Sequence, residues 1–265
     1  MDSEQTSSSE LPYILVTNDD GIDSPGILAL VNAMKKLGEV IVVAPDRQQS
    51  AVGHALTVLN PLRITPFRRN GEKFGFEING TPSDCVKLAM SAIVKRKPDL
   101  IVSGINYGKN TSVNILYSGT VSAATEGMLI GIPSIAFSLA SYDYNADFSL
   151  VADYSLELAK IVLEKGLPKG TLLNVNVPAI PKEELKGVKV TRLSDSFWTD
   201  NYEMRVDPFG WKYYWFSGKY NTVDTDLEAD DFAIENGYIS VSPIQFHFTN
   251  LDFMENLKHL EKKIF

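Results

Sequence analysis

Residues 13–45 read YILVTNDDGIDSPGILALVNAMKKLGEVIVVAP, and their pattern indicates the fold class. The apolar run 13–16 predicts a buried parallel strand, which ends in the polar sequence NDDG. Ser24 followed by Pro25 is a good N-cap and first-turn pair for a helix. Apolar residues then recur at helical spacing until Gly38, and the run 40–43 predicts the next strand. Together these elements form one β-α-β unit, which should be parallel and right-handed.

The rest of the chain repeats this alternation. Helical patterns begin at Thr81, Ser118 and Leu150, and apolar runs predict strands at 99–102, 134–137, 172–175 and 188–190. Two extended stretches around Asn70-Gly71 predict a hairpin within 54–79. The expected fold class is therefore α/β, with a doubly wound, mostly parallel sheet.

Residues 197–220 have a different character, because they contain ten aromatic side chains, including all three tryptophans. Residues 211–216 alternate as in a strand, and the turn signal DPFG precedes them at 207–210. The pattern predicts a hairpin arm with more aromatic surface than a ribbon in water should carry. Three interpretations compete, in this order: a contact between subunits, packing on the parent domain, and a platform on which bases stack.

Composition limits the partners and the compartment. Acidic residues outnumber basic ones, 33 against 25, and no Lys/Arg cluster exceeds residues 95–97, which disfavours long DNA or RNA. A small anionic substrate is still compatible with this charge if a metal inverts the local field. The polar residues 1–10 contain no apolar core of a signal peptide, and no apolar run is long enough to span a bilayer. With one cysteine, Cys85, and hence no intrachain disulfide, we expect a cytoplasmic protein.

Polar oxygen donors follow the first three parallel strands, at the edge of the sheet where ligands bind in such folds. The first strand ends at Asp19 and Asp20, the second leads to Ser50, and the third leads to Asn106. This all-oxygen set suits Mg²⁺, Mn²⁺ or Ca²⁺ rather than zinc or copper. An isolated Asp-Asp-Gly is more often a helix cap or a turn, but the convergence of three strand ends favours a metal site.

A second candidate element is the helix start Ser118-Gly119-Thr120. Free backbone N–H groups, two hydroxyls and a glycine at that place can cradle a phosphate, although an ordinary N-cap uses the same residue types. His54 is a candidate catalytic acid, with a solvated or core histidine as the safer interpretation. No G-x-G-x-x-G follows the first strand and the glycine loop at 104–109 is an incomplete P-loop, which disfavours phosphate transfer from ATP.

Several segments in order resemble the SurE family of stationary-phase survival proteins, which are nucleotidases acting on nucleoside monophosphates. The segments are ILVTNDDGIDSPGI, VVAPDRQQSAVGHALT, NGTPSDCV and PDLIVSGINYGKNTSVNILYSGTVSAATEG, followed by LLNVNVP, VKVTRL and ENGYISVSPI. The resemblance covers roughly residues 13–244. It implies a Rossmann-like core with a C-terminal β-hairpin/helix arm for oligomerisation, which builds dimers and often tetramers.

The resemblance also implies which residues form the site. It assigns one divalent cation per subunit, Mg²⁺ or Mn²⁺, to the positions of Asp19, Asp20, Ser50 and Asn106. It places Asn18, Asn110, Ser118, Gly119 and Thr120 around the phosphate. The domain division that we expect is a leader at 1–11, a catalytic core at 12–195, and an oligomerisation arm with a C-terminal strand and helix at 196–265.

The expected activity is metal-dependent hydrolysis of a phosphomonoester, as in a 5'-nucleotidase. Asp19 and Asp20 hold the metal, and one of them takes the proton of the attacking water. Two alternatives stay open. One is a phosphatase that passes through an aspartyl phosphate, although such enzymes typically separate their two aspartates by one residue. The other is a nucleotide-binding regulatory module without catalysis.

Overall fold

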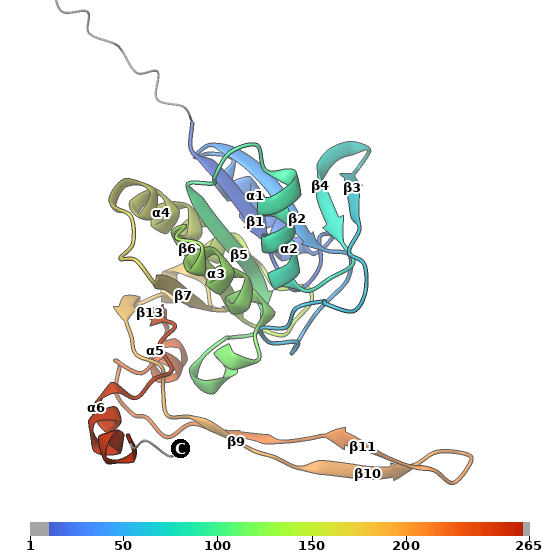
Figure 1. The fold of residues 1–265 in the computed structure, drawn as a ribbon. Helices are drawn as coiled ribbons and strands as arrows, with labels where there is room; N and C mark the ends of the chain where they lie inside the picture. Colours follow the sequence, from blue (N-terminus) through green and yellow to red (C-terminus); the bar gives the residue numbers. More distant parts are fainter. Residues whose placement is uncertain (1–10, 262–265) are drawn as a thin grey trace, which may run out of the picture.

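The computed structural model describes residues 11–261, and its centre is a nine-stranded, mostly parallel sheet (Figure 1). The strand order is β3-β4-β2-β1-β5-β6-β7-β13-β8. The bounds are β1 (Tyr13–Thr17), β2 (Glu39–Pro45), β3 (Ile64–Arg69), β4 (Glu72–Ile78), β5 (Leu100–Tyr107), β6 (Ser134–Ala140), β7 (Thr171–Pro178), β8 (Gly187–Val190) and β13 (Tyr238–Gln245). The α/β prediction is confirmed. Residues 1–10 of the predicted leader lie outside the described part of the chain.

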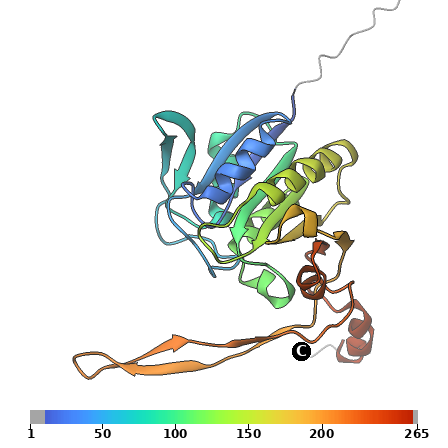
Figure 2. The same ribbon diagram turned by 180° about the vertical axis from the view of Figure 1, so that it is seen from behind.

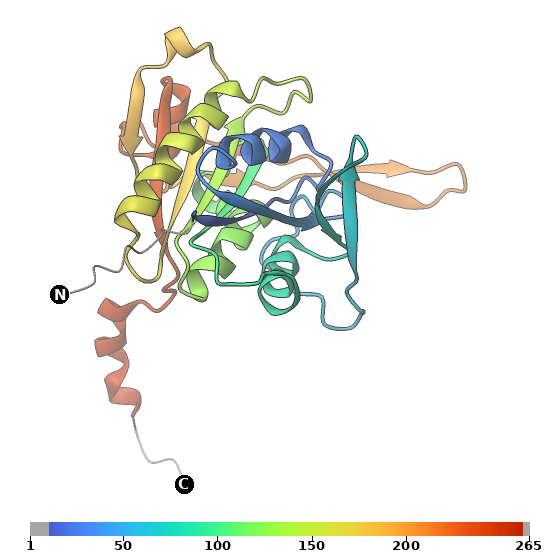
Figure 3. The same ribbon diagram turned by 90° about the horizontal axis from the view of Figure 1, so that it is seen from above.

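Helices cover both faces of this sheet, as Figure 3 shows from above. One face carries α1 (Pro25–Met34) and α4 (Ser149–Lys165), and the other carries α2 (Pro82–Leu88), the π-helical turn η1 (Ala89–Ile93) and α3 (Gly119–Leu129). Ser24 accepts a hydrogen bond from the amide of Ile27, which confirms the predicted cap of α1. Strand β1 is buried along its whole length because it is covered on both sides.

The predicted hairpin is also present. Strands β3 and β4 pair antiparallel, and the two turn residues Asn70 and Gly71 have φ of 52° and 84°. Positive φ at both central positions is what a two-residue hairpin turn requires, and Asn-Gly is the sequence that tolerates it best. This hairpin extends the sheet beyond β2, through the parallel pairing of β2 with β4.

Residues 230–245 join the core, which differs from the predicted division of the chain at residue 196. Strand β13 lies between β7 and β8, antiparallel to the first and parallel to the second. Its Ile239 and Val241 are buried in the main hydrophobic cluster. The short helix α5 (Asp230–Glu235) packs against β13 and β7. Burial of these apolar residues joins the segment 230–245 to the sheet, so this part of the predicted arm belongs to the core.

The aromatic segment forms a long hairpin that projects from the body of the molecule (Figures 1 and 2). At the base of the hairpin, β9 (Phe197–Thr199) pairs with β12 (Lys219–Asn221). In its outer part, β10 (Tyr202–Val206) pairs with β11 (Lys212–Phe216). Trp211 and Trp215 in the outer part are 74% and 59% exposed. Packing on the parent domain is therefore wrong for the outer part, while the other two interpretations stay predictions.

The last described residues form α6 (Leu251–Met254) and the turn η4 (Glu255–Leu260), which extend away from the sheet in Figure 3. Two further short turns are η2 (Ser112–Leu116) and η3 (Lys182–Glu184). Across residues 11–261, we find no helix with the length and apolar character that crossing a membrane requires.

Candidate metal and substrate site

The site lies at the point where the sheet reverses its winding. Strand β1 has β2 on one side and β5 on the other, so the chain leaves β1 in one direction and later continues in the opposite one. Such a switch point opens a crevice beyond the carboxyl ends of the strands. A cavity of about 230 Å³ occupies this place. It is lined by Asp19, Ser50, Ala51, Asn106, Tyr107, Gly108, Lys109, Asn110, Asn114, Tyr117, Ser118 and Tyr142.

Asp19, which follows β1, is buried against the first residues of α3. The hydroxyl of Thr120 donates to its Oδ1. Burial raises the pKa of Asp19, and hydrogen bonds from Thr120 and from the Gly119 amide act against that rise. A Cβ on Gly119 would lie 2.7 Å from the Cβ of Asp19, so only glycine permits this approach. The start of α3 therefore donates hydrogen bonds to the carboxylate of Asp19.

Asp20 lies on the border with a second cavity of about 420 Å³, which shares Tyr107 with the first. Its Oδ2 accepts a hydrogen bond of 3.2 Å from the Tyr107 amide. Burial, and then repulsion by Asp19, raise the pKa of Asp20 to about 7. Two carboxylates that repel each other in this way are favoured by a cation beside them.

Of the two neutral oxygen donors, Ser50 lies in the loop after β2 and Asn106 lies near the end of β5. The Gln49 amide donates to the Asp19 carbonyl at 2.7 Å, which brings the segment with Ser50 to the end of β1. A register shift in β5 between Ser103 and Asn106 turns the latter toward the cavity. The Asn106 Nδ2 donates to the Tyr107 and Gly108 carbonyls at 2.9 and 2.8 Å, so Oδ1 is the atom of that amide that could bind a cation.

These residues fit a hard divalent cation. Three of the four predicted ligands, Asp19, Ser50 and Asn106, line one cavity, and Asp20 adjoins it. Every donor is oxygen, and two of them carry charge. Within residues 11–261, no group of three or more His, Cys, Asp and Glu side chains could hold a metal, so the hydroxyl and the amide are needed to complete this set.

The predicted phosphate-binding residues divide into two groups. Asn110 and Ser118 line the cavity. The Asn110 Nδ2 donates to the Ser138 hydroxyl at 2.9 Å, and its backbone amide donates to Asn176 at 2.7 Å, so the residue is fixed on both sides. Ser118 caps α3 by accepting from the Val121 amide at 3.1 Å.

The other three residues make contacts outside the cavity lining. Asn18 is fully buried, and its Nδ2 donates to the Gly21 carbonyl and the Ser24 hydroxyl, both at 2.9 Å. It braces the NDDG turn. Gly119 and Thr120 contact Asp19 instead of the open space. For these residues the structure favours a supporting role over direct contact with a phosphate.

His54 does not line the cavity either. Its Nε2 lies 2.7 Å from Oε1 of the nearly buried Glu126, whose Oε2 lies 2.9 Å from the Lys87 ammonium. This bond ties the loop that carries Ser50 to helix α3, and it does not favour the catalytic-acid interpretation of His54. The partner is 72 residues away in sequence, so no local pattern could have found it.

Sequence reasoning missed the other seven residues of the cavity wall, among them Lys109, Asn114, Tyr117 and Tyr142. Lys109 lies in the sequence between the predicted site residues Asn106 and Asn110, and this position could have indicated that it lines the site. Tyr142 comes from the loop after β6 and lies against Gly108, where a Cβ would be 2.4 Å from its ring. Only the folded sheet brings it there.

Fold and site together define a doubly wound α/β protein with a candidate all-oxygen cation site at the switch point of its sheet. Comparison with known proteins narrows this class. The family model described as "Survival protein SurE" matches residues 14–200, which is more than half of the chain. The chain belongs to the SurE family.

Curated relatives match over nearly the whole length. A protein from Chlorobium chlorochromatii (strain CaD3), named 5'-nucleotidase SurE, is 47% identical over 262 residues, which are 99% of this chain and 96% of the relative. A protein of the same name from Flavobacterium johnsoniae is 47% identical, over 94% of this chain and 96% of its own. The crystal structure of the SurE protein from Aquifex aeolicus superposes with a TM-score of 0.82 at 43% identity, covering 95% of this chain and all of that one.

Proposed function

We propose that this chain is a metal-dependent 5'-nucleotidase that hydrolyses nucleoside monophosphates to nucleoside and phosphate. The observation that carries the proposal is the cavity at the end of β1, where Asp19, Ser50 and Asn106 meet Asn110 and Ser118. Cation ligands thus stand beside groups that can hold phosphate oxygens. The names of the full-length relatives support the same reaction.

The roles in the site follow from the contacts of each side chain. Asp19, Asp20, Ser50 and Asn106 would hold one divalent cation, Mg²⁺ or Mn²⁺. When bound, such a cation neutralises charge on the phosphate and activates water. One of the two carboxylates accepts the proton of the attacking water.

Residues on the other wall of the cavity would bind the non-bridging oxygens of the phosphate. Ser118 can donate its hydroxyl hydrogen while its oxygen accepts from the helix, and Asn110 is held rigidly by the neighbouring strands. Donors that are fixed before the reaction stabilise charge as it spreads in the transition state.

The same proposal includes a cytoplasmic location and self-association as a dimer or tetramer. The single cysteine, Cys85, is buried, which suits a reducing compartment without requiring it. The exposed aromatic surface of the outer arm supports a contact with a second copy of the chain.

Turnover of AMP by purified protein tests the activity. We expect release of phosphate with Mn²⁺ or Mg²⁺, and a loss of at least about 10-fold in Asn106→Ala. Asn145→Ala, in an exposed loop outside the cavity, is the matched control and should behave like the parent. Nucleotide binding without any turnover would support the regulatory module instead. Capture of an aspartyl phosphate in a single-turnover experiment would support the covalent route.

A further inference from the structure

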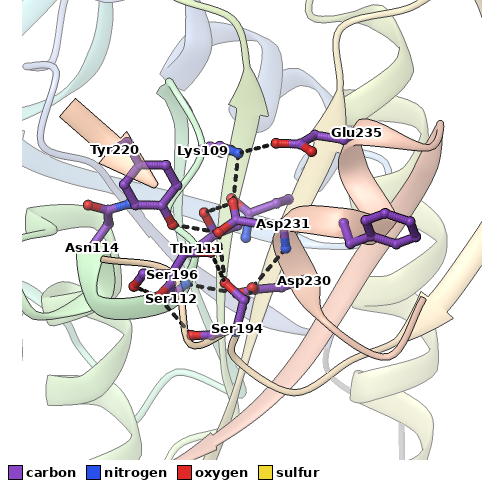
Figure 4. Close-up of polar contacts among 12 residues, drawn as sticks. Lys109, Thr111, Ser112, Asn114, Ser194, Ser196, Tyr220, Asp230, Asp231 and Glu235 are labelled. Atoms are coloured by element: carbon purple, nitrogen blue, oxygen red, sulfur yellow. Dashed lines mark hydrogen bonds and ion pairs between the residues drawn. The ribbon is translucent and has the colours of Figure 1, made fainter. Parts of the chain in front are cut away.

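One part of the cavity wall is held by segments that follow residue 190 in the chain. The Lys109 ammonium lies 2.6 Å from Asp231 Oδ1 and 3.5 Å from Glu235 Oε1, both on α5. The Asn114 Oδ1 accepts a hydrogen bond of 2.7 Å from the Trp198 indole at the base of the arm. Figure 4 shows the contacts of Lys109 with Asp231 and Glu235. Lys109 and Asn114 both line the cavity.

Asp231 is the centre of these contacts. Its Oδ1 accepts from Lys109 and, at 2.6 Å, from the Thr111 hydroxyl. Its Oδ2 accepts from the Ser194 hydroxyl at 2.7 Å and from the Tyr220 hydroxyl. Burial would raise the pKa of Asp231, but these hydrogen bonds, that of Lys109 first, outweigh it and lower the pKa. The carboxylate is therefore a fixed anion that joins the cavity loop to the arm.

The preceding residue fixes the same loop through the backbone. Asp230 Oδ2 accepts from the Ser112 amide at 3.0 Å, and its Oδ1 accepts from the Ser194 amide at 2.9 Å. Both aspartates are fully buried. These bonds restrict the movement of residues 109–112, so the backbone position of Lys109 is fixed.

Lys109 supplies positive charge to a site that otherwise carries negative charge. Of the described residues that line the cavity, it is the one with a cationic side chain. The side chain is 22% exposed, so it is held and still accessible. An ammonium group has three donors, and a carboxylate partner that fixes its position reduces the entropy lost when an anion binds.

We propose that Lys109 is a substrate-binding residue of this chain, which contacts the phosphate of the nucleotide, and that Asp231 is the positioning residue that holds it there. The inference rests on the proposed nucleotidase function and adds one residue for substrate binding to it. Trp198 and Tyr220 belong to the same support, so the base of the arm forms part of the substrate site.

Steady-state kinetics with AMP, and inhibition by inorganic phosphate, test this on the full chain with Mn²⁺. Lys109→Met should raise KM and the phosphate inhibition constant about 10-fold or more, with kcat within about threefold of the parent. Lys109→Arg should restore most of the loss, and added salt should weaken the parent more than Lys109→Met. Lys182→Met is the control, because that lysine is exposed, pairs with Asp153 and does not line the cavity.

The positioning role has a separate readout. Asp231→Asn should raise KM, and the double variant with Lys109→Met should be no worse than Lys109→Met alone, since both changes remove one interaction. Additive effects would overturn the role of Asp231. If Asp231→Asn does not fold, the Lys109 variants carry the test on their own.

An unchanged KM and phosphate inhibition constant in a folded Lys109→Met variant would overturn the proposal while leaving the nucleotidase intact. If the parent hydrolyses no nucleotide, the proposed function fails, and equilibrium dialysis of AMP then tests Lys109 separately. In that case, binding by the parent that Lys109→Met weakens would retain the contact, and equal binding or none would refute it.

Discussion

Truncation of two tryptophans on the outer arm, Trp211→Ala with Trp215→Ala, should weaken self-association while leaving the fold of the subunit unchanged. Both side chains are mostly exposed in the subunit, 74% and 59%. Their loss should therefore change the free energy of unfolding of the monomer by no more than about 0.5 kcal/mol per residue. A subunit that unfolds in this variant would contradict the exposure seen in the structure.

The expected effect on association follows from the surface that a partner can cover. A tryptophan presents roughly 200 Å², so the exposed parts of the two side chains amount to about 270 Å². At about 25 cal/mol per Å², complete coverage is worth about 7 kcal/mol, and coverage of half of it about 3.4 kcal/mol. The second value corresponds to a dissociation constant raised about 300-fold.

Light scattering over a dilution series measures self-association. On the same samples, unfolding by urea measures the stability of the subunit, and turnover of an aryl phosphate measures activity. Leu59→Ala is the control, because this side chain is 95% exposed on a loop of the core. A double variant with the parent's mass at every concentration would refute the subunit contact. If that variant instead loses discrimination between bases, the stacking platform is the correct interpretation.

The remaining predictions concern the site. Because every proposed ligand is oxygen, EDTA should abolish turnover and Mg²⁺ or Mn²⁺ should restore it; full activity in verified metal-free protein contradicts the metal site. Asp19→Asn and Asp20→Asn should each lower kcat by at least about 100-fold in folded protein, as circular dichroism and turnover will show. Burial would raise the pKa of Glu126, but His54 and Lys87 lower it, so its stabilisation is present above about pH 4.5 and lost as the pH falls. Glu126→Gln should cost about 1–2 kcal/mol at pH 7 and less at pH 4 in urea unfolding, and equal losses at both pH values would contradict this sign.

The sequence predicts best those features that depend on neighbours in the chain. The helix expected from Ser118 through Leu129 begins and ends as predicted, because its cap and its apolar spacing are local. The strand ends that carry Asp19 and Asn106 follow from apolar runs that stop at polar residues. The parallel order of these strands then brings the ligands together without further information.

Prediction fails where the partner is distant in the chain. Strand β13 has the pattern of any half-buried strand, and nothing local places it between β7 and β8. The contact of Lys109 with Asp231 joins residues 122 positions apart, and the opposite charges have many alternative partners in the sequence. The predicted phosphate cradle at Gly119 and Thr120 shows the same limit of local sequence. A helix start can bind any anion that the fold places beside it, and in this structure the nearest one is Asp19.

The path of the chain after Ser194 explains why the two halves of the arm should behave differently. Residues 197–199 and 219–221 pair at its base, and Tyr220 reaches the buried Asp231 from there. The base is thereby joined to α5 and β13, and so to the sheet itself. Within residues 11–261, the outer ladder makes no such bonds to the core, and its aromatic residues are exposed. A change at the outer tryptophans should therefore alter the oligomer and spare substrate binding, whereas a change at Asp231 should alter substrate binding in any oligomeric state.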